Sequence, residues 1–257
     1  MVVVSSLNGV PSEPRIITFA KPLSQSDFLN PRRGWRYDAT MESLDSLLRE
    51  AEVAHGHLCA GQVLGVRMAM LGCRMLGIDD PRGLTSRADR KRLVTFVEID
   101  RCATDAIAVV TGCRLGKRAL KFRDWGKMAA SFLDLGRAAD PALGLEAIAG
   151  GRAVRIAALE SSKQRARELY PQIEGKNAQQ MLAYRELPDE ELFSTEWVSI
   201  PLHAREMPGY KSARIACDVC GEGINYDREV VREDADGTRT TLCQACAFPE
   251  SRYYQRL

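Results

Sequence analysis

The chain has 257 residues, of which 45% are hydrophobic and 27% are charged, a composition that excludes a disordered or collagen-like protein. Its 36 basic and 34 acidic residues leave a formal net charge of +2, which gives no indication of a polyanionic partner. The most apolar stretch, residues 58–77, is interrupted by Arg67 and Arg74, so we expect no membrane contact. The first residues lack a basic start and an apolar run, so we expect a cytoplasmic protein without a signal peptide.

The N-terminal part of the chain changes character near residue 39. Residues 1–38 contain four prolines and no hydrophobic period, which predicts an irregular arm. Apolar residues then recur at helical spacing from Met41 toward His55, which predicts a first helix.

A second helix is predicted between Gly56 and Gly77. It is apolar on nearly every face, which favours a central, buried position, and Gly77 is a typical C-terminal cap. Gly61, Gly65 and Ala69 recur every four residues and predict a smooth stripe that another helix or a sheet can approach closely.

The remaining elements predict an α+β core, residues 39–160, with an antiparallel sheet and helices packed on one face. A helical extension and linker, residues 161–210, follows. Strands are predicted over residues 93–99, 119–122, 128–133, 153–158 and 197–202, and helices over 100–112 and, with a break at Pro171, 161–187. The Asp124–Lys127 segment predicts a hairpin turn between the second and third strands.

The C-terminal residues 211–257 carry two Cys-x-x-Cys pairs separated by 22 residues. The four thiols are Cys217, Cys220, Cys243 and Cys246. Two such pairs flanking predicted strands over 226–233 and 238–242 are typical of a structural zinc site in a small zinc-ribbon-like or treble-clef-like module. Two redox dithiols or an iron–sulfur cluster are the alternatives. The segment has seven basic and eight acidic residues, so we expect no nucleic-acid binding and favour a structural or protein-contact role.

His55, His57 and Cys59 place three potential metal ligands within five residues, with a glycine between the histidines. Imidazole and thiolate together favour a transition metal, and a thiol at a helix start is predisposed to the thiolate form. The alternative is that one histidine caps the helix and Cys59 fills core space.

The other polar and thiol groups divide by position. Cys73 is 14 residues beyond Cys59 in the same predicted helix, about 21 Å away, and is interpreted as core. Cys102 starts a helix after a strand, where a ligand or an activated thiol is expected. Cys113 lies at the far end of that helix and joins the same site only through a partner chain or a returning loop. Asp105 and Lys127 are candidates for supporting the ligands or for proton transfer.

Four segments together resemble the FmdE family, which takes its name from a subunit of formylmethanofuran dehydrogenase. They are His-Gly-His-Leu-Cys-Ala-Gly-Gln-Val-Leu-Gly-Val-Arg-Met-Ala (55–69), Cys-Ala-Thr-Asp-Ala-Ile (102–107), Thr-Gly-Cys-Arg-Leu-Gly-Lys (111–117) and Phe-Arg-Asp-Trp-Gly-Lys-Met-Ala (122–129). Two positions depart from the family pattern. Ala60 stands where proline is common, and Arg114 stands where threonine is common.

The resemblance implies an α+β core that forms a homodimer, with a metal-binding cleft around the His–Cys motif. Our first hypothesis is a metalloprotein with structural zinc and a second transition metal. It would serve redox, one-carbon or metal-cofactor metabolism as a subunit of an oxidoreductase complex or as an accessory protein. A self-contained enzyme with thiol or sulfur-transfer chemistry at Cys59 or Cys102, assisted by Asp105 and Lys127, is the second hypothesis. A regulatory module that contacts a partner protein through its zinc ribbon is the third.

Overall fold

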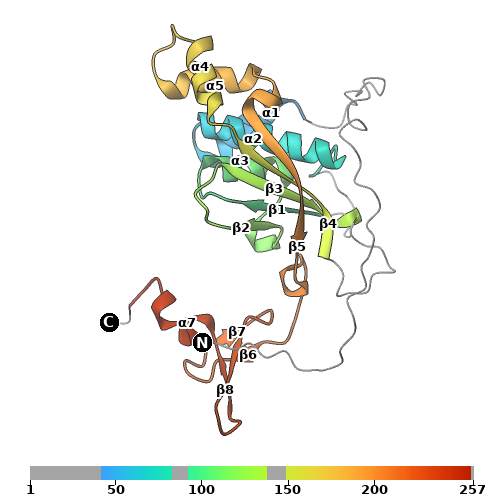
Figure 1. The fold of residues 1–257 in the computed structure, drawn as a ribbon, viewed down its shortest axis with the longest axis vertical. Coiled ribbons are helices and arrows are strands. Elements are labelled where there is room, and N and C mark those ends of the chain that lie inside the picture. Colours follow the sequence, from blue (N-terminus) through green and yellow to red (C-terminus); the bar gives the residue numbers. More distant parts are fainter. Residues whose placement is uncertain (1–41, 83–91, 138–148, 256–257) are drawn as a thin grey trace, which may run out of the picture. The chain divides into compact units, whose positions relative to one another are not determined.

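The computed structural model describes residues 42–82, 92–137 and 149–255 (Figure 1), so the predicted arm over residues 1–38 lies outside the described residues. Its helices are α1 (Leu44–His55), α2 (Ala60–Leu76), α3 (Cys102–Thr111), α4 (Ser161–Leu169), α5 (Lys176–Glu186), α6 (Asp189–Leu192) and α7 (Gln244–Ala247). Its strands are β1 (Leu93–Val97), β2 (Leu120–Phe122), β3 (Ala129–Asp134), β4 (Ala149–Ala158), β5 (Phe193–Pro201), β6 (Ile215–Ala216), β7 (Gly223–Ile224), β8 (Val230–Glu233) and β9 (Arg239–Leu242).

The first two helices end where the sequence indicates. Helix α1 follows Ser43, whose hydroxyl accepts a hydrogen bond from the Ser46 amide at 3.2 Å. It ends at Gly56, which adopts a left-handed conformation with φ of 94°. Helix α2 ends in the same way at Gly77, with φ of 69°. A side chain would strain the backbone at both positions, which explains why glycine stops each helix.

Strands β1 to β5 form a mixed sheet in the order β2-β1-β3-β4-β5. Strand β1 is parallel to β2 and antiparallel to β3, and the pairs β3–β4 and β4–β5 are antiparallel. The predicted hairpin across Asp124–Lys127 is wrong, because β2 and β3 lie on opposite sides of β1 rather than beside each other. Helix α3 makes the crossover that the parallel β1–β2 pair requires.

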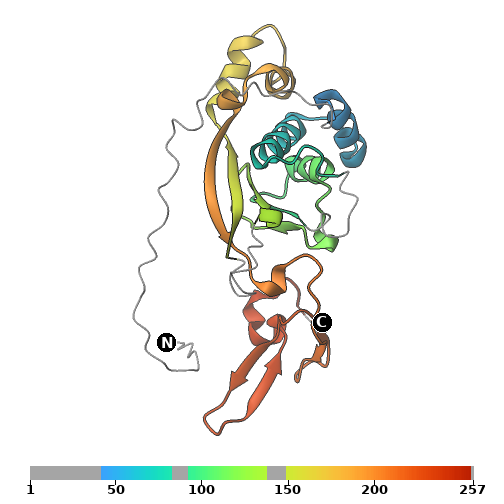
Figure 2. The same ribbon diagram turned by 90° about the vertical axis from the view of Figure 1, so that its right-hand side faces the viewer.

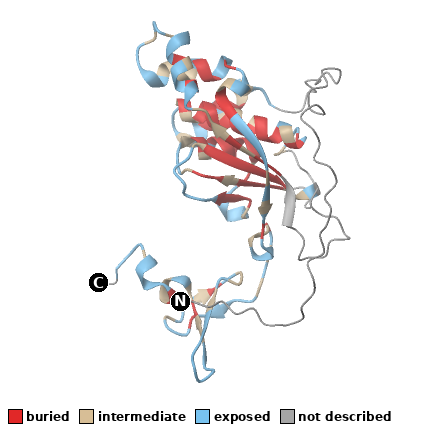
Figure 3. Cartoon of the chain, in the orientation of Figure 1, coloured by how far each residue is buried: buried red, intermediate tan, exposed pale blue. Residues whose placement is uncertain are grey.

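Helices α1, α2 and α3 cover one face of this sheet (Figure 2), as expected from the sequence. Alternate residues of β3 and β4 turn to that face, including Phe132, Val154 and Ile156, each 0% exposed. Leu133 and Ala153 turn to the other face, where they pack with Leu202. Figure 3 shows that burial is concentrated in α2, α3 and the central strands.

The glycine stripe of α2 lies against two neighbours. A methyl group on Gly65 would lie 2.5 Å from the carbonyl oxygen of Ala103 in α3, and one on Gly72 would lie 2.4 Å from the ring of Phe132 in β3. Only a glycine fits such distances, so the spacing in α2 sets how closely α3 and the sheet approach. None of the helices in the described ranges is long and apolar enough to cross a membrane.

Candidate metal sites

The four C-terminal cysteines converge on one point. The antiparallel pair β6–β7 forms a knuckle around Cys217 and Cys220, with Gly221 at φ of 74° where the chain turns. Hairpin β8–β9 leads into Cys243, which precedes α7, and Cys246 lies on that helix. Ligand atoms of the four thiols all lie within 4.8 Å of one another, and no other set of three or more His, Cys, Asp or Glu residues in the described ranges meets that criterion.

The chemistry of these thiols fits a divalent cation. Backbone amides of Cys220 and Cys243 donate to the Cys217 sulfur and lower its pKa to about 6. Burial and then the neighbouring thiols raise the pKa of Cys246 to about 12. A bound cation relieves this mutual repulsion, since metal coordination requires deprotonated thiolates. Four sulfur donors are the ligand set that tetrahedral zinc prefers.

The module around this site has little apolar core of its own. Its cluster of buried residues consists of Cys217, Ile224, Leu242 and Ala247. One of these is itself a candidate ligand. A core of this size stabilises a fold poorly without a cross-link or a metal.

The second region, which we call the His–Cys group, consists of His55, His57, Cys59 and Cys102. His55 ends α1, and the chain turns at Gly56 so that the two imidazole rings lie 4.9 Å apart. Cys59 is the residue that precedes α2, and Cys102 is the first residue of α3. Two segments more than 40 residues apart therefore bring their thiols to neighbouring helix starts, where the helix dipoles favour negative charge.

Asp105 holds one histidine of this group. The His55 Nδ1 atom lies 2.8 Å from the Asp105 Oδ2 atom, a distance that joins the end of α1 to the first turn of α3. The His55 side chain is 19% exposed and that of Asp105 is 58% exposed. This contact leaves the other ring nitrogen of His55 available to a ligand, as in metal sites where a carboxylate orients the imidazole.

The two thiols meet beside Gly61. A methyl group on Gly61 would lie 3.4 Å from the Cys102 Cβ atom and 3.7 Å from the Cys59 sulfur. Burial and then the nearby Cys59 thiol raise the pKa of Cys102. Cys102 is therefore protonated at neutral pH unless a cation is bound beside it, which makes it a weak nucleophile by itself.

Helix α5 supports the start of α2 at two points, a feature that the sequence did not indicate. The Asn177 side-chain oxygen accepts a hydrogen bond from the Ala60 amide at 3.0 Å. Two turns further along α2, Arg67 donates to the carbonyl oxygens of Tyr184 and Leu187 at 2.8 and 2.9 Å. These partners are 117 or more residues apart in the chain, so no local pattern could reveal them.

The remaining predicted residues lie elsewhere. Lys127 is exposed, its ammonium group 5.8 Å from the centre of the Trp125 ring, and no hydrogen bond or ion pair among the described residues joins it to the His–Cys group. Cys73 is 0% exposed within the core, in agreement with the sequence. Cys113 is also buried, where its sulfur accepts a hydrogen bond from the Thr95 hydroxyl at 3.4 Å.

A family model described as "FmdE, Molybdenum formylmethanofuran dehydrogenase operon" matches residues 54–194, more than half of the chain. The chain belongs to the FmdE family. The matched range includes the His–Cys group and extends through α6 to the beginning of β5.

Two known proteins resemble this FmdE-family chain. A crystal structure of an FmdE-like protein of tungsten formylmethanofuran dehydrogenase from Syntrophus aciditrophicus superposes with a TM-score of 0.50 and 18% identity, covering 83% of this chain and 96% of that one. This likeness establishes a shared fold. A protein of Archaeoglobus fulgidus named "Probable S-adenosyl-L-methionine-binding protein" is 32% identical over 133 residues. The match covers 51% of this chain and 34% of that relative's length.

Proposed function

We propose that this protein is a metal-dependent subunit or accessory protein in redox, one-carbon or metal-cofactor metabolism. In this proposal a transition metal is bound by His55, His57 and Cys59, with Cys102 completing the set or serving as a reactive thiol. The four-cysteine module binds structural zinc and presents a surface to a partner protein. Membership of a family named for a formylmethanofuran dehydrogenase operon supports a protein partner.

One contact carries the proposal of a second metal. A carboxylate that fixes an imidazole through Nδ1 is the arrangement found behind metal-ligating histidines. The 2.8 Å contact between His55 and Asp105 supplies that arrangement beside two thiols. When bound, the metal would supply Lewis acidity or redox capacity. The chain's own groups would orient His55 through Asp105 and hold both thiols at the helix starts.

The thiol-enzyme alternative is less favoured. Its nucleophile would be Cys59 or Cys102, and the raised pKa of Cys102 disfavours its thiolate without a cation. Lys127, the predicted assistant in proton transfer, makes its ring contact with exposed Trp125 instead. This alternative predicts activity that is sensitive to alkylation and survives removal of the second metal.

Metal content of the purified full chain tests the proposal. We expect more than one metal per wild-type chain, and loss of the metal beyond the module's zinc in both His57→Ala and Cys59→Ser, with little change in melting temperature. His203→Ala is the matched control, since His203 is exposed and lies outside both candidate sites. A wild-type chain with a single metal, unchanged in both variants, would refute the second site.

We also propose a homodimer, on the basis of the family resemblance. The apolar faces of α2 supply no argument for it, because Val63, Val66 and Met68 are 0% exposed within one chain. Light scattering of the full chain at tens of micromolar should give twice the chain mass. A monomer at that concentration would contradict the proposal.

A further inference from the structure

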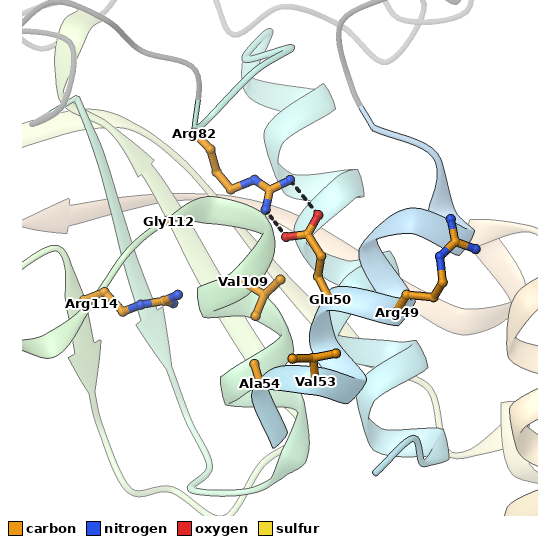
Figure 4. Close-up of a pocket in the computed structure, with 8 residues that line it drawn as sticks. All are labelled: Arg49, Glu50, Val53, Ala54, Arg82, Val109, Gly112 and Arg114. Carbon is orange, nitrogen blue, oxygen red and sulfur yellow. Dashed lines mark hydrogen bonds and ion pairs between the residues drawn. The ribbon is translucent and has the colours of Figure 1, made fainter. Parts of the chain in front are cut away.

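A cavity of about 450 Å³ opens at the other end of the α1–α3 pair from the His–Cys group (Figure 4). Along α3, the distance from Asp105 to Gly112 is about 10 Å, so the two features share helices but no residues. Its volume is within the range of about 300–1,000 Å³ typical of small-molecule sites. The lining residues are Arg49, Glu50, Val53, Ala54, Arg82, Val109, Gly112 and Arg114.

The charges around this cavity do not balance. Arg82 pairs with Glu50 and, on its other side, with Glu42. Its guanidinium lowers the pKa of Glu50, so that carboxylate stays ionised and satisfied at neutral pH. Arg49 and Arg114 make no ion pair among the described residues. Three guanidinium groups thus face two carboxylates, and the excess positive charge lies on Arg49 and Arg114.

Arg114 is the better placed of the two. Its backbone is fixed, because its carbonyl oxygen accepts hydrogen bonds from Lys117 and Leu120 at 3.2 Å each, and buried Cys113 precedes it. Figure 4 shows its side chain extending toward α1, whereas Arg49 lies on the far side of Glu50. Its side-chain contact is a long 3.4 Å hydrogen bond to the Cys113 carbonyl oxygen. Most of its guanidinium donors therefore remain free for a ligand.

The wall between the arginines is apolar. Val53 is 84% exposed, an unusual position for a valine, and Ala54 and Val109 line the cavity beside it. Apolar area next to a free guanidinium suits a ligand that combines an anionic group with an apolar body. Arginine binds carboxylates and phosphates through paired N–H donors, which gives both affinity and orientation.

We propose that this cavity is a binding site for a small organic anion, a carboxylate or phosphate monoester attached to a flat apolar group. Arg114 binds the anionic group, the Arg82–Glu50 pair forms a fixed side of the site, and Val53, Ala54 and Val109 contact the apolar body. No residue of either candidate metal site takes part, so the proposal stands independently of the proposed metal chemistry.

Calorimetric titration of the full chain with 1-naphthyl phosphate, 1-naphthoate and neutral 1-naphthamide tests this site. We expect at least one of the two anions to bind at least about tenfold more tightly than the amide, because a charge-assisted hydrogen bond is lost in the amide. Arg114→Gln should weaken anion binding about tenfold or more. Lys117→Gln, an equal change of charge outside the cavity lining, should leave it unchanged. Whether the phosphate or the carboxylate binds better identifies the anionic group.

A second variant keeps the test decisive if Arg114→Gln folds poorly. Val53→Asp places a negative charge at an exposed position of α1 and should abolish anion binding without affecting the core. Equal affinity for the amide, equal effects of Arg114→Gln and Lys117→Gln, or no anion binding by the wild type at millimolar concentration would each overturn the proposal. Metal content measured on the same samples keeps this result separate from that of the second metal.

Discussion

The four-cysteine module and the His–Cys group place similar side chains on very different supports. In the module, four sulfurs lie within 4.8 Å of one another, and few buried apolar residues surround them. In the His–Cys group the side chains lie further apart, but they start from α1, α2 and α3, which pack into the main core. The first region has its ligands assembled and lacks a scaffold, and the second has a scaffold whose ligands are positioned from behind.

This difference indicates what each metal would do. Where the ligands dominate, metal binding contributes to folding. Where the scaffold dominates, a metal can be removed with little loss of structure, which is the property expected of a functional rather than a structural site. Substitutions that separate ligand from scaffold can therefore break or sharpen the comparison.

The largest effect is expected from Cys217→Ser or Cys243→Ser. Structural zinc contributes about 10–16 kcal/mol in zinc-finger peptides, so residues from about 211 onward should unfold while the core persists. Limited proteolysis with zinc analysis measures this. Val219→Ala, at a 67% exposed position between the cysteines of the knuckle, is the matched control and should keep its zinc. Full protease resistance of both cysteine variants would show that the module does not depend on its metal.

Gly65→Ala should have an intermediate effect and act on the scaffold alone. A methyl group there would lie 2.5 Å from the Ala103 carbonyl oxygen, and overpacking of this kind costs about 1–3 kcal/mol. Urea unfolding of the core measures the change. Gly116→Ala meets nothing within 4 Å and should change stability little. Equal stability of the two variants would mean that α2 and α3 move apart freely.

Asp105→Asn should have the smallest effect on stability and a selective effect on metal. Loss of a carboxylate behind a ligating histidine typically reduces metal affinity about 10- to 100-fold. The carboxylate is largely exposed, so the melting temperature should stay the same. Competition with a chelating dye measures the affinity, and Asp100→Asn, an exposed acid two residues before α3, is the control. Identical affinities in the two variants would remove Asp105 from the site.

The same contrast explains what could be predicted from the sequence. The two Cys-x-x-Cys pairs are local and flank short strands, so spacing alone located the cluster. Helix α2, its end at Gly77 and its glycine stripe were also local signals. The β2–β3 hairpin was predicted wrongly because a turn between two apolar runs does not reveal that β1 inserts between them.

The His–Cys group was predictable only in part. His55, His57 and Cys59 are near neighbours in the sequence, and the family resemblance added Cys102 and Asp105. The contact between His55 and Asp105 joins residues 50 positions apart, and that between Asn177 and Ala60 joins residues 117 positions apart. Pairings over such separations depend on how α1, α3 and α5 pack, which hydrophobic periodicity does not encode.

Helix α5 runs beside α2 like a splint. Asn177 holds the first amide of α2, next to Cys59, and Arg67 holds the last turn of α5 two helical turns further on. Both fastenings are about 10 Å apart on each helix, as a seven-residue step requires. The two helices therefore form a single lever arm: a force applied to the outer surface of α5 is transmitted to the sulfur of Cys59 without bending either helix.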